Sequence, residues 1–217
     1  MKLTILYDNT VILPELKKDW GFSCLIEGEG IPTILFDTGG DGHILMHNMK
    51  VLGIPAESVE IVFISHNHYD HTGGLSYFLH ENPNVSVYVP RSFRGVKRAK
   101  KIIQVDEKPV TIREGIFSTG EIAGIEQSLC IPSGSGSLLV TGCSHPPFRK
   151  ILKACEKAGG EPVRKIAGGF HGFSDYKLIE PMEMVCATHC TQHKKEIQDH
   201  TAAGAWIPGG TGTVISL

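Results

Sequence analysis

The feature that most constrains this chain is the stretch SHNHYDHTGG, which begins at Ser65 and directly follows the apolar run VEIVFI. Within six residues it places three histidines and one aspartate. Imidazole and carboxylate groups are the ligands that Zn, Fe and Mn ions take in proteins. A short apolar run predicts a buried strand. We therefore expect these ligands in a loop at a strand end, which is where functional side chains concentrate.

The spacing of the four side chains predicts a site with two metal ions. His66 and His68 are two residues apart, so their rings point to the same side if the extended conformation continues beyond the strand. Asp70 and His71 follow after the chain has bent, so they approach from another direction. One pair from each direction is what two ions roughly 3.5–4 Å apart require.

Composition predicts a globular protein rather than a disordered or membrane-spanning chain. The chain has 217 residues, with 41% hydrophobic and 20% charged residues, which suits a single domain over residues 1–217. A net charge of −2 gives no general attraction to nucleic acid or anionic membranes. There is no apolar run of about 20 residues and no signal-peptide pattern, so we expect a cytoplasmic protein without membrane contact. The six cysteines are expected to be reduced thiols, and Cys143 and Cys190 lie beside histidines that matter below.

The pattern of short apolar runs predicts mostly strands, with helices in both halves. Runs at residues 2–7, 22–27 and 33–37 predict an antiparallel meander. The segment PSGSGS at 132–137 predicts a turn. Helical spacing and stop residues predict helices over the following segments: 42–53, 75–82, 147–160, 175–180 and 190–200. Two mostly β layers flanked by helices fit this order.

The motif HNHYDH resembles the HxHxDH signature of the metallo-β-lactamase superfamily of metal-dependent hydrolases. The resemblance implies an α+β fold, a four-layer αββα sandwich with the metals at one edge between the sheets. It also implies that Asp37, in ILFDTGG, orients the ligands of the signature loop without binding metal itself. An ordinary turn-forming aspartate is the other interpretation of Asp37.

The resemblance also implies a ligand set for two divalent ions, with Zn as the first choice and Fe or Mn as alternatives. His145, in LLVTGCSH, and His189, in MVCATH, are the later ligands that it implies. The predicted metal ligands are therefore His66, His68 and His145 for one ion, and Asp70, His71 and His189 for the other. Many members have an upstream histidine and a bridging aspartate that this chain lacks. Cys143 and Glu121 are possible additional ligands in their place, or His145 replaces the missing histidine.

Seven motifs occur in the order found in one branch of the superfamily: FDTGG, SHNHYDHTGGL, STGEI, EQSL, TGCSH, GGFH and THCT. This branch is named 7,8-dihydropterin-6-methyl-4-(β-D-ribofuranosyl)aminobenzene-5'-phosphate synthase. The resemblance places His171, in GGFHGF, at the pocket, where we expect it to act as a catalytic residue or to contact substrate or ligands. Longer members of the branch carry an insertion between STGEI and EQSL, where this chain has only residues 123–125. Gln192, Pro146 and Pro147 also depart from the branch.

These features favour a metal-dependent hydrolase that uses a hydroxide held by two metals on a small-molecule ester, with Asp70 as a general base. The basic run RSFRGVKRAKK, residues 91–101, suggests a phosphorylated substrate docked by Arg91, Arg94 and Arg98, with a solvated basic face as the other interpretation. A synthase of the pterin pathway is the alternative function. A nuclease or a non-catalytic ligand-binding protein are further alternatives, and nucleic acid is not an expected partner because no appended basic region is present.

Overall fold

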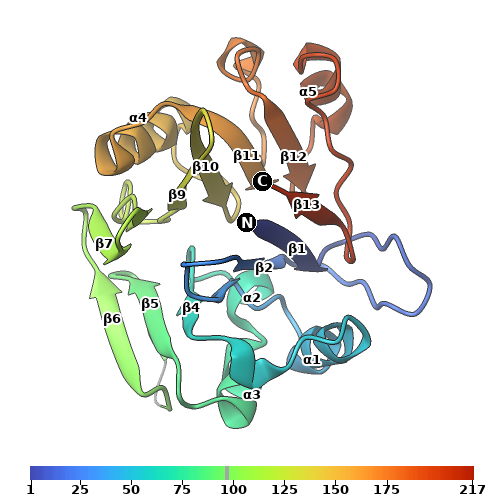
Figure 1. The fold of residues 1–217 in the computed structure, drawn as a ribbon, viewed down its shortest axis with the longest axis vertical. Helices are drawn as coiled ribbons and strands as arrows, with labels where there is room; N and C mark the ends of the chain where they lie inside the picture. Colours follow the sequence, from blue (N-terminus) through green and yellow to red (C-terminus); the bar gives the residue numbers. More distant parts are fainter. Residues whose placement is uncertain (96–97) are drawn as a thin grey trace. The chain divides into compact units, whose positions relative to one another are not determined.

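The computed structural model describes residues 1–95 and 98–217, which form two compact units. Unit 1 comprises Met1–Gln104 and Gly209–Leu217, and unit 2 comprises Val105–Pro208. Each unit contains one mixed β-sheet with its own helices (Figure 1). The fold class is therefore α+β, as predicted. That residues 1–217 act as a single domain stays a prediction.

The sheet of unit 1 has seven strands and combines an antiparallel half with a parallel half. In spatial order the strands are β13 (Val214–Ser216), β1 (Lys2–Tyr7), β2 (Ser23–Glu27), β3 (Ile34–Phe36), β4 (Ile61–Phe63), β5 (Ser86–Pro90) and β6 (Lys101–Val105). The first four pair antiparallel, which confirms the predicted meander of β1, β2 and β3. Strands β3, β4 and β5 are parallel, so β3 and β4 end at the same edge, where Asp37 and the histidine-rich turn follow them.

Two helices of unit 1 bury their apolar faces in one core with the sheet. Helix α1 (Gly42–Val51) begins after Asp41, whose carboxylate accepts the His43 backbone N–H at 2.7 Å, and Gly53 follows it with φ 69°. The short helix α2 (Tyr69–Thr72) and helix α3 (Leu75–Glu81) continue directly from the signature turn. A 3₁₀ turn, η1, spans Ala56–Ser58. The buried side chains that α1 and α3 contribute are Leu45, Met49, Leu75, Phe78 and Leu79, packed with Val62 and Val87 of the sheet. This packing anchors the chain immediately after the predicted metal ligands.

The sheet of unit 2 has six strands, also part antiparallel and part parallel. In spatial order they are β12 (Met184–Thr188), β11 (Val163–Gly169), β10 (Gly136–Thr141), β9 (Leu129–Ser133), β8 (Ile116–Ser118) and β7 (Val110–Arg113). Strands β7 to β10 are antiparallel, and β10, β11 and β12 are parallel. The predicted turn at PSGSGS joins β9 to β10 at Gly134, which has φ 67°. Short apolar runs at residues 109–112, 137–142, 163–169 and 182–189 predict β7, β10, β11 and β12, whereas no predicted run covers β8 or β9.

Helix α4 (Phe148–Gly159) is the crossover between the parallel strands β10 and β11. Its buried side chains recur every three or four residues, at Phe148, Ile151, Leu152 and Cys155, and they pack into the core of unit 2. Burying each large side chain of this kind contributes roughly 1.5–3 kcal/mol. Gly160 ends the helix in the left-handed conformation, with φ 77°, as the sequence predicts.

Two helix predictions in unit 2 were wrong in part. Residues 175–180 form only one 3₁₀ turn, η2 (Tyr176–Leu178), because Pro181 follows and disfavours helical backbone at the preceding residue. Helix α5 (Lys194–His200) starts four residues later than predicted, because the carbonyl of Thr188 accepts the backbone N–H of Thr191 and forms a turn first.

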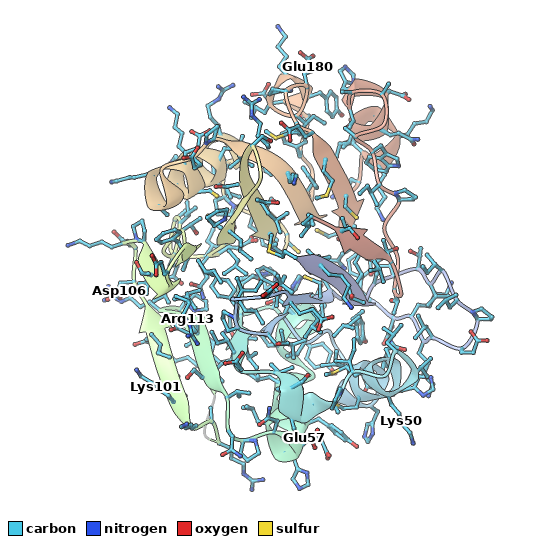
Figure 2. The ribbon with its side chains drawn as sticks, in the orientation of Figure 1. Lys50, Glu57, Lys101, Asp106, Arg113 and Glu180 are labelled. Carbon is cyan, nitrogen blue, oxygen red and sulfur yellow. The ribbon has the colours of Figure 1, made fainter. Side chains whose placement is uncertain are left out.

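Charged side chains such as Lys50 of α1 and Glu57 of η1 are exposed on the outside of unit 1 (Figure 2). Over residues 1–95 and 98–217, no helix has the length and apolar character that crossing a membrane demands.

Candidate metal centre

The signature turn brings the rings of His66 and His68 together in unit 1, edge to face, with 75° between the ring planes. Strand β4 ends at Phe63, and the chain continues through a buried Ser65 to His66, which is 1% exposed. The Nε2 atom of His66 lies 3.1 Å from Nδ1 of His68, and the ring centroids are 4.6 Å apart. The two side chains therefore converge as the spacing predicted, although the strand itself ends three residues before His66.

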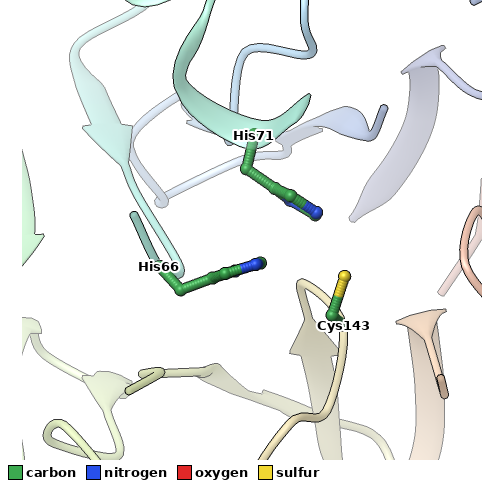
Figure 3. Close-up of side chains that lie close together, drawn as sticks. All are labelled: His66, His71 and Cys143. Atoms are coloured by element: carbon green, nitrogen blue, oxygen red, sulfur yellow. The ribbon is translucent and has the colours of Figure 1, made fainter. Parts of the chain in front are cut away.

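Asp70 and His71 approach the same place from helix α2. His71 is fully buried, and its ring centroid lies 4.2 Å from that of His66; Figure 3 shows both rings. The carboxylate of Asp70 is 19% exposed and lies 3.9 Å from Nε2 of His71. All four predicted ligands of the signature turn are thus gathered within unit 1.

Asp37 fixes the orientation of these histidines through a fully buried hydrogen-bond network. It follows β3 with φ 53°, and its carboxylate accepts hydrogen bonds from the Ser65 backbone N–H, the Ser65 hydroxyl and His71 Nδ1, each at 2.7 Å. Because the Ser65 hydroxyl gives its only proton to Asp37, it accepts from His66 Nδ1, which lies 2.9 Å away. Both histidines therefore carry their proton on Nδ1 and present the lone pair of Nε2.

This arrangement fits a metal ion. Zn–N bonds of about 2.0–2.1 Å in a tetrahedral shell place two ligand nitrogens about 3.3 Å apart. The nitrogens of His66 and His68 are 3.1 Å apart, so they can share one ion with little movement. Metal-binding histidines are usually oriented by a hydrogen bond from the ring nitrogen that does not bind the metal. His71 makes this bond to Asp37, and His66 makes it to Ser65. The mixed imidazole and carboxylate donors suit Zn, Fe or Mn.

In unit 2, Glu126 holds the loop after β10, which carries Cys143 and His145. Its carboxylate is 1% exposed and accepts four backbone N–H groups of this loop. Oε1 accepts from residues 142, 143 and 144 at 3.0, 3.0 and 3.1 Å, and Oε2 accepts from His145 at 2.9 Å. Such a charged acceptor, fully buried, fixes the loop backbone firmly.

The loop after β12 places His189 and Cys190 near Cys143. His189 has φ 47°, an uncommon conformation for a residue with a side chain, and is 4% exposed. The Cys190 thiol lies 3.9 Å from the carbonyl oxygen of Cys143. A hydrogen bond with the Cys143 side chain lowers the pKa of the Cys190 thiol, although burial acts in the opposite direction.

His145 and His171 lie against each other in unit 2, with ring centroids 5.0 Å apart. His171 is exposed and has φ 42°. Both line a cavity of about 850 Å³, together with basic side chains of α4. Strained backbone at an exposed histidine is a frequent feature of functional sites.

The model of the metallo-beta-lactamase superfamily matches residues 21–155. The chain belongs to this superfamily.

One relative by sequence and one solved structure agree with this assignment. The 7,8-dihydropterin-6-methyl-4-(beta-D-ribofuranosyl)-aminobenzene-5'-phosphate synthase of Methanocaldococcus jannaschii is 30% identical, over 81% of this chain and 82% of the relative. That alignment spans 241 positions against a chain of 217 residues, so the relative carries residues with no counterpart here. The crystal structure of Tm1679, described as a metal-dependent hydrolase of the beta-lactamase superfamily, has a TM-score of 0.78 and 25% identity, covering 100% of this chain and 99% of its own.

A third protein shows the fold alone. The metallo-beta-lactamase fold protein YhfI of Bacillus subtilis is 16% identical, with a TM-score of 0.68, covering 99% of this chain and 98% of its own. The predicted family and the predicted fold are therefore confirmed.

The roles predicted for single residues of this superfamily member stay predictions. His145 and His189, proposed as later ligands, lie in unit 2, as do Cys143 and Glu121. Glu121 is 4% exposed, and its backbone N–H donates to the carbonyl of Asp106 at 2.8 Å.

Part of the basic run lines a cavity beside the signature turn. Arg94 and Arg98 border a space of about 390 Å³ in unit 1, together with Asn67 and Thr72 of the signature segment. Among the residues described, Arg91 is not part of this lining, and its carbonyl accepts a hydrogen bond from Arg94. Val96 and Lys97 of the run lie outside the described residues.

Sequence reasoning missed the parts played by Ser65 and Glu126. Ser65 is the first residue of the signature segment. Only the structure shows that its hydroxyl donates to Asp37 and accepts from His66 Nδ1, and so links the two side chains. Glu126 begins the motif EQSL and lies three residues before strand β9, so the available signal was an acidic residue close to a buried strand.

Proposed function

We propose that this chain is a metal-dependent hydrolase of small-molecule esters, and that its preferred substrate is phosphorylated. The observation that carries the proposal is a hydrogen-bond network. Asp37 accepts from Nδ1 of His71, and the Ser65 hydroxyl, itself bonded to Asp37, accepts from Nδ1 of His66, so Nε2 of each ring carries the lone pair that a metal would bind. The likeness to Tm1679, a metal-dependent hydrolase by its description, supports it.

In such a reaction the residues of this chain would have separate roles in metal binding and proton transfer. His66 and His68 would hold one ion, and Asp70 and His71 would hold the other. His145 and His189 stay the predicted further ligands of the first and the second ion, respectively. When bound, divalent ions in a site of this kind lower the pKa of water from 15.7 to about 7 and so supply a nucleophile at neutral pH. The carboxylate of Asp70, which is 19% exposed and so within reach of water, would in a second role accept a proton from water as general base. The buried carboxylate of Asp37 holds the proton on Nδ1 of His71 throughout.

The cavity beside the signature turn supports a phosphorylated substrate. Guanidinium groups bind phosphate through paired hydrogen bonds, and Arg94 and Arg98 both line this cavity. Its remaining walls include Leu75, Leu79 and Phe93, which suit the carbon part of a small molecule. Asn67 and Thr72 of the same lining belong to the signature segment, so the cavity borders the segment that carries the predicted metal ligands.

An activity assay with matched variants tests the hydrolase. We expect the purified chain, supplied with Zn²⁺ or Mn²⁺, to hydrolyse p-nitrophenyl phosphomonoesters or phosphodiesters, and a chelator to stop the reaction. His71→Ala should lower kcat/KM by about 100-fold or more, because it removes a ligand. His80→Ala, an exposed histidine of the same unit on α3, is the control and should retain activity. Equal activity of the two variants would refute the assignment.

The substrate class has its own test. The double variant Arg94→Glu, Arg98→Glu should raise KM for phosphorylated esters by about 10-fold or more while leaving KM for uncharged p-nitrophenyl acetate unchanged. Lys50→Glu, an exposed charge reversal on α1, should change neither value. A rise in KM for both kinds of ester would mean that the arginines support the fold instead of the phosphate.

The second candidate function is a synthase of the kind named for the relative from Methanocaldococcus jannaschii. The 30% identity favours it, and the compound in that name is itself a phosphate ester, which the arginine-lined cavity could bind. Mass spectrometry that detects formation of this compound from its pterin and aminobenzene parts, without ester hydrolysis, would establish the synthase in place of the hydrolase.

A further inference from the structure

The cavity of about 850 Å³ in unit 2 combines a positively charged wall with an aromatic wall. The charged wall is the start of helix α4, and the aromatic wall includes the segment 170–178, which follows strand β11. The volume lies within the range of about 300–1,000 Å³ that small-molecule sites in proteins usually have. The cavity therefore has the size and the mixed lining of a ligand site.

Three cationic side chains of α4 line the cavity: Arg149, Lys150 and Lys153. Arg149 and Lys153 are four residues apart, and Lys150 and Lys153 are three apart, so they are neighbours on one face of the helix, where like charges repel. Arg149 and Lys150 also lie in the first turn, which has no acidic residue and where positive charge is unfavourable. Helix stability therefore does not explain this group of charges, whereas an anion in the cavity would offset their repulsion.

The charge of the cavity lining is only partly balanced. Asp175 lines the cavity, and its carboxylate accepts a hydrogen bond from the Arg149 guanidinium at 2.8 Å. Of the described residues in this lining, Asp175 alone carries a negative charge, against three positive ones. The lining therefore has a surplus of positive charge, which Lys150 and Lys153 provide.

The aromatic wall consists of Phe148, Phe170 and Phe173. Their ring centroids lie 4.7, 5.1 and 5.7 Å apart in the three pairs. The rings are at most 8% exposed and belong to the apolar core of unit 2, in which burial raises the pKa of the Cys130 thiol well above its usual range. A small part of each ring thus reaches the cavity, where it can pack against an aromatic ring of a ligand.

Backbone contacts hold the aromatic wall in place. The Phe173 N–H donates to the carbonyl of Phe170 at 2.9 Å, and the Phe170 N–H donates to the Thr191 hydroxyl at 3.0 Å. Gly169, directly before Phe170, packs so closely that a Cβ atom there would lie 2.8 Å from the sulfur of Cys190. The wall is therefore preformed, and ligand binding needs little ordering of side chains.

We propose that this cavity binds an aromatic anion, that is, an aromatic ring that carries a carboxylate or a phosphate group. The anionic group pairs with Lys150 and Lys153, and the ring packs against Phe148 and Phe173. These contacts involve none of the predicted metal ligands and no residue of the arginine-lined cavity in unit 1. The site goes beyond the proposed function, because it requires neither bound metal nor hydrolysis.

Ligand binding to the metal-free chain tests the charged wall. Isothermal titration in a buffer that contains a chelator measures Kd for benzoate and for phenylphosphonate, and the tighter ligand identifies the anionic group. The double variant Lys150→Gln, Lys153→Gln should weaken binding about 3- to 10-fold, because each lysine contributes one partly screened ion pair. Lys157→Gln, at an exposed lysine of α4 outside the lining, is the matched control and should bind unchanged.

A second carboxylate tests the aromatic wall. Benzoate should bind at least about 2-fold tighter than cyclohexanecarboxylate, and Phe173→Leu should remove this preference. Phe117→Leu should keep it, because Phe117 packs against the same core but does not line the cavity. Circular dichroism checks the fold of each variant. The comparison of the two carboxylates in the unaltered chain decides the point even if Phe173→Leu does not fold.

The outcomes separate this proposal from the proposed function. It is refuted if neither anion binds the metal-free chain, if Lys157→Gln weakens binding as much as the double variant, or if cyclohexanecarboxylate binds as tightly as benzoate. Binding that is lost in Arg94→Glu, Arg98→Glu would place the ligand in the cavity of unit 1 and would also refute it. The expected binding in a chain without esterase activity would support this proposal and refute only the proposed function.

Discussion

Replacing Glu126 by glutamine removes one charge from the centre of unit 2 and keeps the shape of the side chain. The glutamine oxygen can still accept the three N–H groups that now reach Oε1, but its amide nitrogen would face the N–H of His145, which Oε2 now accepts at 2.9 Å. Losing a hydrogen bond to a charged group costs about 1.5–3 kcal/mol, and the three remaining bonds each weaken when the acceptor is neutral. The neutral side chain avoids part of the cost of burying a charge. The net loss of unfolding free energy is therefore about 2–4 kcal/mol.

Thermal and denaturant unfolding measure this loss. For a chain of this size we expect Tm to fall by roughly 5–15 °C, because each kcal/mol shifts Tm by about 2–4 °C. Glu180→Gln, at an exposed position of the same unit (Figure 2), should change the unfolding free energy by less than about 0.5 kcal/mol. If Glu126→Gln is no more destabilising than this control, then the Glu126 carboxylate does not hold the loop, and the rigidity assigned to Cys143 and His145 is wrong.

Three further predictions concern other parts of the chain. Asp37→Asn should weaken metal binding about 10- to 100-fold in a chelator competition, because the amide no longer fixes the proton on Nδ1 of His71, and unchanged affinity would contradict this. Gly169→Ala should lower the unfolding free energy by about 1–3 kcal/mol, whereas Gly172→Ala, whose Cβ would meet nothing closer than 3.7 Å, should be nearly neutral in the same denaturant titration. The raised pKa of Cys130 means that the folded state holds this proton more tightly than the unfolded state, so its stabilisation is complete below the usual thiol value of about 8.5 and declines above it. Unfolding free energy measured at pH values from about 9 upward should therefore fall less steeply in Cys130→Ala than in the unaltered chain, by up to about 1.4 kcal/mol per pH unit, and identical slopes would refute this.

The sequence predicts best where the signal is local. The turn after β4 follows from a buried strand, four ligand side chains in six residues and a glycine pair, all of them neighbours in the chain. Helix α4 follows from one apolar face and a glycine stop, and its observed end at Gly159 agrees.

The parts that sequence reasoning missed depend on contacts between distant residues. Ser65 acts through Asp37, 28 residues away, and Glu126 acts on His145, 19 residues away. The spacing of apolar and polar residues along the sequence does not predict hydrogen bonds between residues so far apart. The predicted helix at residues 175–180 was wrong because a following proline outweighed its apolar spacing. Strands β8 and β9 were missed because one is only three residues long and the other contains Pro132, which lowers its resemblance to a strand.

Metal content tests the central claim most directly. Elemental analysis of the chain purified without added metal, and again after reconstitution, is compared with His68→Ala and with His80→Ala as the matched control. The account predicts about two equivalents of Zn, Fe or Mn in the unaltered chain and in the control, and a loss of about one equivalent in His68→Ala. A chain that holds no metal after reconstitution, or a His68→Ala variant with unchanged metal content, would contradict it.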